Sequence, residues 1–234
     1  MHKRTLSSRS QIVTETQNRS VSNQQTPSSS RLTNINPTPK CFSRFNESLN
    51  VIPGVSTKPT LVLDLDEVLI HTTWKNTPTS TLLKLPITQE TVMHVTDRSL
   101  GFIPMWVAVR QGVCECIRKL SEKYEIVIWT AAVREYANVV MEHLGVLDVV
   151  AKVLCRENCI YTNFTYKKAL HTLGRDLEQI IIVDDKAVNF IEHFQCGIEM
   201  KPFQGENDSL FETLTEYLIE FAKDFNLKRM VHYW

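Results

Sequence analysis

The chain has 234 residues, 43% of them hydrophobic, which is enough for one sizeable domain with a real core and some additional segments. Its 26 basic and 26 acidic side chains give a formal net charge of zero. It contains no run of about eighteen apolar residues, which argues against a membrane span.

The first fifty residues differ in composition from the rest. They carry seven Lys and Arg side chains against two acidic ones, whereas the remaining 184 residues carry nineteen against twenty-four. They also hold sixteen Ser and Thr residues and few large apolar side chains, too few to offset the entropy of ordering. We therefore predict that residues 1–50 are a disordered, basic leader, flexible or phosphorylatable, ahead of a domain over residues 51–234. An organelle transit peptide is less favoured, because the leader's apolar side chains form no sustained helical stripe.

After the leader, short apolar runs alternate with amphipathic stretches, as an α/β sheet with crossover helices requires. Strands are predicted at 61–65, 125–129, 149–154 and 180–183. Amphipathic helices are predicted over 113–123, over 133–144 with Gly145 as the stop, and over 210–225. The expected fold class is α/β, with a parallel central sheet flanked by helices.

Residues 72–109 form an insertion after the first strand that this sheet does not need. Short strands are predicted within it at 82–85, 91–95 and 105–109. A small antiparallel β flap is therefore expected.

Polar side chains lie at or just beyond the carboxyl ends of three of the predicted strands. They are Asp64 and Asp66, Thr130, and the pair Asp184 and Asp185. Ligands of open parallel sheets bind in the crevice at that edge, so the acidic ends should converge if the strands are neighbours. Four carboxylates in one crevice would repel each other unless a divalent cation sat among them, and oxygen ligands favour Mg²⁺. Because Mg²⁺ is usually held by few carboxylates together with substrate phosphate, a phosphate substrate is expected.

The six cysteines do not alter this picture. Cys114 and Cys116 fall inside a predicted helix, and Cys155 and Cys159 lack a second close pair at zinc-ligand spacing. We expect free thiols in a reducing, intracellular compartment.

The ordered motifs resemble the aspartate-nucleophile phosphotransferases of the haloacid dehalogenase superfamily. More narrowly, the chain is similar to the small phosphatases that act on the C-terminal domain of RNA polymerase II and to their Dullard-like relatives. The resemblance covers about residues 59–218 and rests on Asp64–Val68 with the following His71, Trp129–Ala132 with Glu135–Ala137, Arg156–Glu157, Lys168 ahead of Leu173–Leu177, and Ile182–Asp185.

The resemblance implies a Rossmann-like fold and a role for each of four side chains. Asp64 would attack phosphorus and form an aspartyl-phosphate. Asp66 would protonate the leaving alkoxide and later deprotonate the attacking water. Thr130 would hydrogen-bond a phosphoryl oxygen, and Lys168 would offset its negative charge.

The resemblance also implies a magnesium site. Its ligands would be Asp64, the main-chain carbonyl of Asp66 and the pair Asp184 and Asp185, with the direct ligand of that pair left open. Many relatives have Asn at the position of Asp185, so this chain would place an additional negative charge near the metal. His71 is given no catalytic role.

Three of these assignments have simpler alternatives. Thr130 could cap the following helix. Lys168 lies beside Lys167, and the sequence alone does not decide which of the two points inward. Asp185 could be a surface carboxylate paired with Lys186, which would contribute little energy.

The resemblance places an apolar pocket for a substrate proline beside the insertion, and Trp74 occupies the expected position for its aromatic wall. Trp74 could instead pack beneath the flap as core, with Trp106 and Phe102 as alternates for the pocket. Relatives often have Ser-Pro where this chain has Lys186-Ala187. This departure weakens the prediction of peptide specificity more than that of catalysis.

The favoured hypothesis is a Mg²⁺-dependent protein serine/threonine phosphatase, acting on the RNA polymerase II tail or another phosphoprotein in the nucleus or cytoplasm. No direct contact with nucleic acid is expected. The alternative is a non-enzymatic binding module of the same fold, such as the domain of a mitochondrial import receptor. A small-metabolite phosphatase is a third possibility, which an open site beside a small flap disfavours.

Overall fold

The computed structural model describes residues 56–73, 75–89, 91 and 100–225. The chain divides into two units, Met1–Asn46 and Glu47–Trp234, and every described residue belongs to the second. The predicted leader, the pocket residue Trp74 and all but the first residue of the predicted strand at 91–95 lie outside the described residues.

A five-stranded sheet forms the centre of the described unit. Its strands, in spatial order, are β10 (Gly197–Glu199), β9 (Ile180–Asp184), β1 (Thr60–Leu63), β5 (Glu125–Trp129) and β6 (Val150–Leu154). Every neighbouring pair is parallel. The predicted parallel sheet is therefore confirmed, and β1 and β9 are buried along their whole length, as expected of strands covered on both faces.

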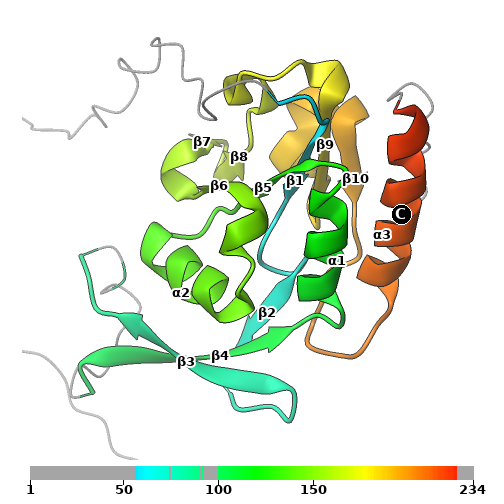
Figure 1. The fold of residues 1–234 in the computed structure, drawn as a ribbon. Coiled ribbons are helices and arrows are strands. Elements are labelled where there is room, and N and C mark those ends of the chain that lie inside the picture. Colours follow the sequence, from blue (N-terminus) through cyan, green and yellow to red (C-terminus); the bar gives the residue numbers. More distant parts are fainter. Residues whose placement is uncertain (1–55, 74, 90, 92–99, 226–234) are drawn as a thin grey trace, which may run out of the picture. The chain divides into compact units, whose positions relative to one another are not determined.

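Successive side chains of a strand point to opposite faces, and this alternation divides the core into two layers. On β1, Leu61 and Leu63 face a core shared with α1 (Val113–Ser121), α2 (Arg134–Leu144) and α3 (Leu210–Phe221). Val62 faces the opposite core, whose cover includes Leu170 and Phe190 from short 3₁₀ segments. The three α-helices therefore cover one face of the sheet (Figure 1).

Two of the predicted helices end differently from each other. Helix α2 stops at Gly145, whose φ of 62° places it in the left-handed region, so that predicted stop is confirmed. The helix predicted over 210–225 ends at Phe221, and residues Ala222–Asp224 form a 3₁₀ turn, η7. The apolar periodicity continues beyond the helix because Phe225 packs edge-on against Tyr124, with ring centroids 6.3 Å apart.

A second, antiparallel sheet follows β1. Its order is β2 (Ile70–Thr73), β4 (Phe102–Val109) and β3 (Ser80–Pro86). The strands predicted at 82–85 and 105–109 are confirmed and are longer than predicted, whereas β2 was not predicted. Thr91 lies in a turn rather than a strand.

The segment between β6 and β9 has no α-helix and was not assigned from the sequence. It holds the two-stranded hairpin β7 (Ile160–Thr162) and β8 (Thr165–Lys167), turned by Asn163 and Phe164 at positive φ. Besides η7, the described residues hold the 3₁₀ segments η2 (Leu147–Val149), η3 (Arg156–Asn158), η4 (Leu170–Leu173), η5 (Leu177–Gln179) and η6 (Ala187–Cys196). Among the described helices, none has the length and apolar character needed to cross a membrane.

Candidate active site

Neighbouring strands β1 and β9 deliver the acidic side chains to one place. Leu63 lies opposite Val183 in the ladder, and the Asp64 amide donates to the Val183 carbonyl at 2.9 Å, so the two acidic motifs begin side by side. Carboxylate oxygens of Asp64, Asp184 and Asp185 lie within 4.8 Å of one another, and all three residues are buried. The predicted convergence of these carboxylates is confirmed.

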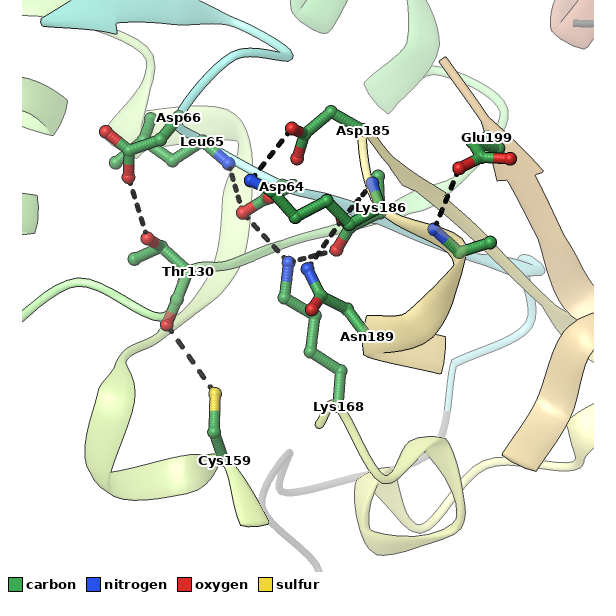
Figure 2. Close-up of polar contacts among 12 residues, drawn as sticks. Asp64, Leu65, Asp66, Thr130, Cys159, Lys168, Asp185, Lys186, Asn189 and Glu199 are labelled. Atoms are coloured by element: carbon green, nitrogen blue, oxygen red, sulfur yellow. Dashed lines mark hydrogen bonds and ion pairs between the residues drawn. The ribbon is translucent and has the colours of Figure 1, made fainter. Parts of the chain in front are cut away.

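A buried ammonium holds two of the three carboxylates. Lys168 Nζ lies 2.8 Å from Asp64 Oδ1 and 2.5 Å from Asp184 Oδ2, and its side chain is fully buried (Figure 2). Burial disfavours the ammonium, but Asp64 and Asp184 outweigh that effect and raise the pKa of Lys168. Lys167 instead approaches Glu192 at 3.4 Å, so the structure selects Lys168 as the inward lysine.

The backbone after the hairpin places Lys168. Strand β8 ends at Lys167, and the Lys168 amide donates to the Asn189 carbonyl of η6 at 2.6 Å. The Asn189 side chain turns back to donate from Nδ2 to Asp184 Oδ1 at 2.8 Å. Segment η6 therefore positions both a lysine and a carboxylate of the cluster.

The two carboxylates of the second motif have different surroundings. Asp184 Oδ1 also accepts from the Lys186 amide at 2.9 Å, so both of its oxygens are engaged by N–H donors of the protein. Asp185 Oδ2 lies 2.9 Å from Lys186 Nζ, whereas Asp185 Oδ1 is buried without a hydrogen-bond partner. A buried, unpartnered carboxylate oxygen is costly, and a cation would satisfy it.

The donor set of the cluster fits a hard divalent cation. Asp64, Asp184 and Asp185 offer only oxygen atoms, as Mg²⁺ prefers. The unpartnered Oδ1 makes Asp185 the better candidate for a direct ligand than Asp184. The Asp185–Lys186 pair is present, but Asp185 is not a surface carboxylate, since 3% of its side chain is exposed.

Asp66 lies beside the cluster with partners of its own. Thr130 Oγ1 donates to Asp66 Oδ2 at 3.1 Å, and the Tyr136 hydroxyl donates to Asp66 Oδ1. Tyr136 is in turn hydrogen-bonded to Thr72, with 2.6 Å between the two hydroxyl oxygens. Burial raises the pKa of Asp66, and the hydrogen bonds from Tyr136 and Thr130 oppose that rise. The side chain is therefore held in one orientation, in surroundings that favour keeping a proton.

Burial also raises the pKa of Asp64, as it does that of Asp66. The Lys168 ammonium opposes this rise by stabilising the ionised Asp64 carboxylate. The Asp64 Oδ1 atom also accepts from the Leu65 amide at 2.8 Å. Lys168 and this amide favour the ionised form that nucleophilic attack requires.

Thr130 is not a helix cap. The residue before α2 is Val133, and no side chain caps that helix. Thr130 Oγ1 accepts from the Ala132 amide at 3.0 Å while donating to Asp66, so it shapes the loop after β5 and orients the acid. The helix-cap alternative is therefore wrong.

The other residues selected from the sequence have separate contacts or lie outside the described residues. Trp74 belongs to the undescribed residues, so its pocket role stays a prediction. Trp106 and Phe102 are half-buried on β4, where the Lys84 ammonium lies 4.9 Å from the Phe102 ring centroid. His71 Nδ1 lies 2.9 Å from Glu67 Oε1, consistent with the structural role expected of it.

Sequence reasoning assigned no role to Tyr136 or Asn189. Tyr136 was part of a quoted motif, but only the fold shows that its hydroxyl reaches Asp66. Asn189 follows Asp184 by five residues, and no periodic pattern predicts that a 3₁₀ segment will fold it back. Its amide could have been found only from the structure.

The parallel sheet, with acidic side chains gathered at the carboxyl ends of its strands, is the α/β arrangement that the motifs predicted. The family model for the NLI interacting factor-like phosphatases matches residues 59–228, and the chain belongs to that family. The resemblance to small phosphatases of the RNA polymerase II C-terminal domain is confirmed at the level of the family.

Curated relatives share moderate identity with the chain. Over 141 residues it is 33% identical to "Phosphatase Herzog" of Drosophila melanogaster, covering 60% of this chain and 37% of that protein. Over 171 residues it is 30% identical to "Carboxy-terminal domain RNA polymerase II polypeptide A small phosphatase 1" of Homo sapiens, covering 73% of this chain and 60% of that protein. The chain therefore spans less than two thirds of the length of either relative.

A solved structure supports the fold. The structure of Fcp1, "an essential RNA polymerase II CTD phosphatase", is similar with a TM-score of 0.50 at 19% identity, covering 74% of this chain and 52% of that one. At this identity the likeness concerns the arrangement of elements rather than the chemistry of the site.

Proposed function

We propose that this protein is a Mg²⁺-dependent phosphoprotein phosphatase that works through an aspartyl-phosphate on Asp64. One observation carries the proposal: Asp64, Asp184 and Asp185 meet in a buried cluster in which Lys168 bridges two carboxylates and Asp185 Oδ1 has no partner. Such a site can bind a cation and a phosphate together. Membership of the NLI interacting factor-like phosphatase family supports the proposal.

The residues divide the reaction into two steps. A carboxylate oxygen of Asp64 forms a bond to phosphorus as the ester oxygen leaves, and the leaving oxygen takes the proton of Asp66. Water then attacks phosphorus and loses a proton to Asp66, which restores the Asp64 carboxylate and releases phosphate. Bound Mg²⁺ would supply positive charge to the phosphoryl oxygens, with Asp64, Asp185 and the Asp66 carbonyl as its protein ligands.

Four further side chains prepare this chemistry. Tyr136 and Thr130 hold the Asp66 carboxyl, and burial favours the protonated form that the first step consumes. Lys168 stabilises the ionised nucleophile and adds positive charge where the phosphoryl group would sit. Asp184 fixes Lys168 from the other side.

We further propose a phosphoserine or phosphothreonine peptide as the substrate. The printed names of the human relative and of Fcp1 concern the C-terminal domain of RNA polymerase II, which makes that tail the first substrate to try. Trp74 is proposed to contact the peptide. The cysteines of the described part of the chain are free thiols, in keeping with the proposed nuclear or cytoplasmic location.

The test is hydrolysis of an aryl phosphate by the purified chain, with Mg²⁺ and with excess chelator. Asp64→Asn should abolish turnover and keep the fold, since an amide cannot act as the nucleophile. Asp148→Asn is the matched control, because Asp148 lies on the surface in an ion pair with Arg118 and should leave turnover unchanged. Turnover that survives in Asp64→Asn or in chelator would reject the mechanism. A folded wild-type protein without turnover would favour the binding module.

A phosphopeptide array with the wild-type protein and Mg²⁺ tests the substrate class. Preferred hydrolysis of phosphoserine or phosphothreonine peptides is expected. Equal or faster hydrolysis of small phosphorylated metabolites would reject a peptide substrate.

A further inference from the structure

Lys186 contributes a second ammonium to the acidic cluster, of a different kind from Lys168. Its Nζ lies 2.9 Å from Asp185 Oδ2, and 60% of its side chain is exposed, against 3% for that of Asp185. Figure 2 shows its side chain extending across the cluster, with its ammonium beside Asp185 and Asp64. Burial lowers the pKa of Lys186. The contact with Asp185 raises it, and the charges of Asp64 and Asp184 add to this rise.

The two lysines differ in their freedom to move. Lys168 is fully buried between two carboxylates, so moving it would leave both without their counter-ion. Lys186 is anchored through its backbone, whose amide donates to Asp184 Oδ1 at 2.9 Å, while its exposed side chain is flexible. Its ammonium can therefore change partners without a change in the fold.

Charge explains why such a change would occur. The ionised carboxylates of Asp64, Asp184 and Asp185 bring three negative charges, and Lys168 and Lys186 bring two positive ones. A divalent cation beside Asp185 would meet the Lys186 ammonium on the same carboxylate, and like charges at that distance repel. Asp185 Oδ1 is open to a cation while Oδ2 holds Lys186, so this repulsion, and not a shortage of ligand atoms, would displace the ammonium.

The phosphate of the substrate offers the displaced Lys186 ammonium a new partner. The charge of Lys168 is already shared by Asp64 and Asp184, which leaves less of it for a phosphoryl group. A Lys186 ammonium released from Asp185 would remain at the mouth of the same cluster, within reach of a dianion bound there.

We propose that Lys186 exchanges partners: it pairs with Asp185 when the metal is absent, yields that carboxylate to a divalent cation, and then pairs with the phosphoryl oxygens of the substrate. The inference rests on the proposed function, because it requires a metal and a phosphate at this cluster. It assigns to Lys186 two opposite effects, weakening the binding of the metal and strengthening that of phosphate.

The test is calorimetric titration of the full chain, first with Mg²⁺ alone and then with inorganic phosphate at saturating Mg²⁺. Lys186→Gln should tighten Mg²⁺ binding roughly fivefold and weaken phosphate binding roughly fivefold, the scale of one partly exposed ion pair. Lys186→Arg keeps the charge and should stay close to wild type in both titrations. Lys123→Gln removes an exposed lysine outside the site and should change neither affinity.

The opposite signs make the result decisive. General damage to the site would weaken both affinities, and a solvated bystander lysine would change neither. Either affinity unchanged in Lys186→Gln, or both shifted in the same direction, would overturn the inference while leaving the proposed function intact. Absence of Mg²⁺ binding in wild type and every variant would overturn both.

Discussion

Removing the Lys168 ammonium should destabilise the fold strongly unless a metal replaces it. In Lys168→Met the side chain keeps its approximate size, but Asp64 and Asp184 lose the cation that lies 2.8 and 2.5 Å from them. At an effective dielectric constant of about 20, each contact is a gross attraction of about 6 kcal/mol. The cost of burying the ammonium offsets much of this, and breaking a buried pair typically costs about 3–5 kcal/mol.

We therefore expect Lys168→Met to lose about 3–5 kcal/mol of unfolding free energy in chelator, a large part of the roughly 5–15 kcal/mol of a typical domain. The loss should be smaller near pH 5 than near pH 8. Burial already raises the pKa of Asp64 above its unfolded value, and without the opposing ammonium that pKa rises further. The stability that comes from protonating Asp64 in the folded state is then present at acid pH and lost as the pH rises.

Urea unfolding followed by circular dichroism, in chelator at both pH values, measures this directly. Lys167→Met is the matched control, since its neighbouring ammonium faces Glu192 at 3.4 Å and should contribute less than about 1 kcal/mol. Equal losses in the two variants, or a loss that does not depend on pH, would refute the argument that Lys168 neutralises the cluster.

The remaining predictions concern the scaffold. Gly197→Ala should lower the free energy of unfolding by about 3 kcal/mol, because a Cβ at this position would lie 1.8 Å from a ring carbon of Phe190. A loss below about 1 kcal/mol in urea unfolding would contradict this close packing. Glu125→Gln should cost about 1 kcal/mol at neutral pH, because Glu125 accepts two hydrogen bonds from Arg175, each 2.9 Å long. Arg175 holds the pKa of Glu125 below its ordinary value of 4.5. The stability that this ion pair contributes is therefore lost as the pH falls below that value, and the advantage of the wild type over Glu125→Gln should shrink. A difference in thermal unfolding that stays constant with pH would disprove this.

Local sequence patterns predicted the elements whose periodicity is strong. The strand at 125–129 and the end of α2 at Gly145 agree with the structure because buried runs and glycine stops are local signals. The hairpin β7–β8 and strand β2 were missed because they are short and only partly buried. The end of α3 was placed too late, since Phe225 keeps the apolar spacing while packing on Tyr124 outside the helix.

The chemistry of the site was readable in the sequence to the extent that it depends on strand ends. Asp64 follows the buried strand β1 and Asp184 ends the buried strand β9, and parallel strands must place such residues on one edge. The choice between Lys168 and Lys167 was different, because two adjacent lysines carry the same local signal. It was decided by the path of the chain after β8 and by the amide contact with Asn189.

The sequence by itself determined an α/β chain with a parallel sheet, acidic strand ends and the residue types for binding a metal and a phosphate. The tertiary structure alone decided that Asp184 is engaged by N–H donors, that Asp185 keeps an unpartnered oxygen, and that Lys186 extends across the cluster. The physical reason is that periodicity and strand order follow from neighbours along the chain. Hydrogen-bond partners and burial follow from contacts between segments far apart in it.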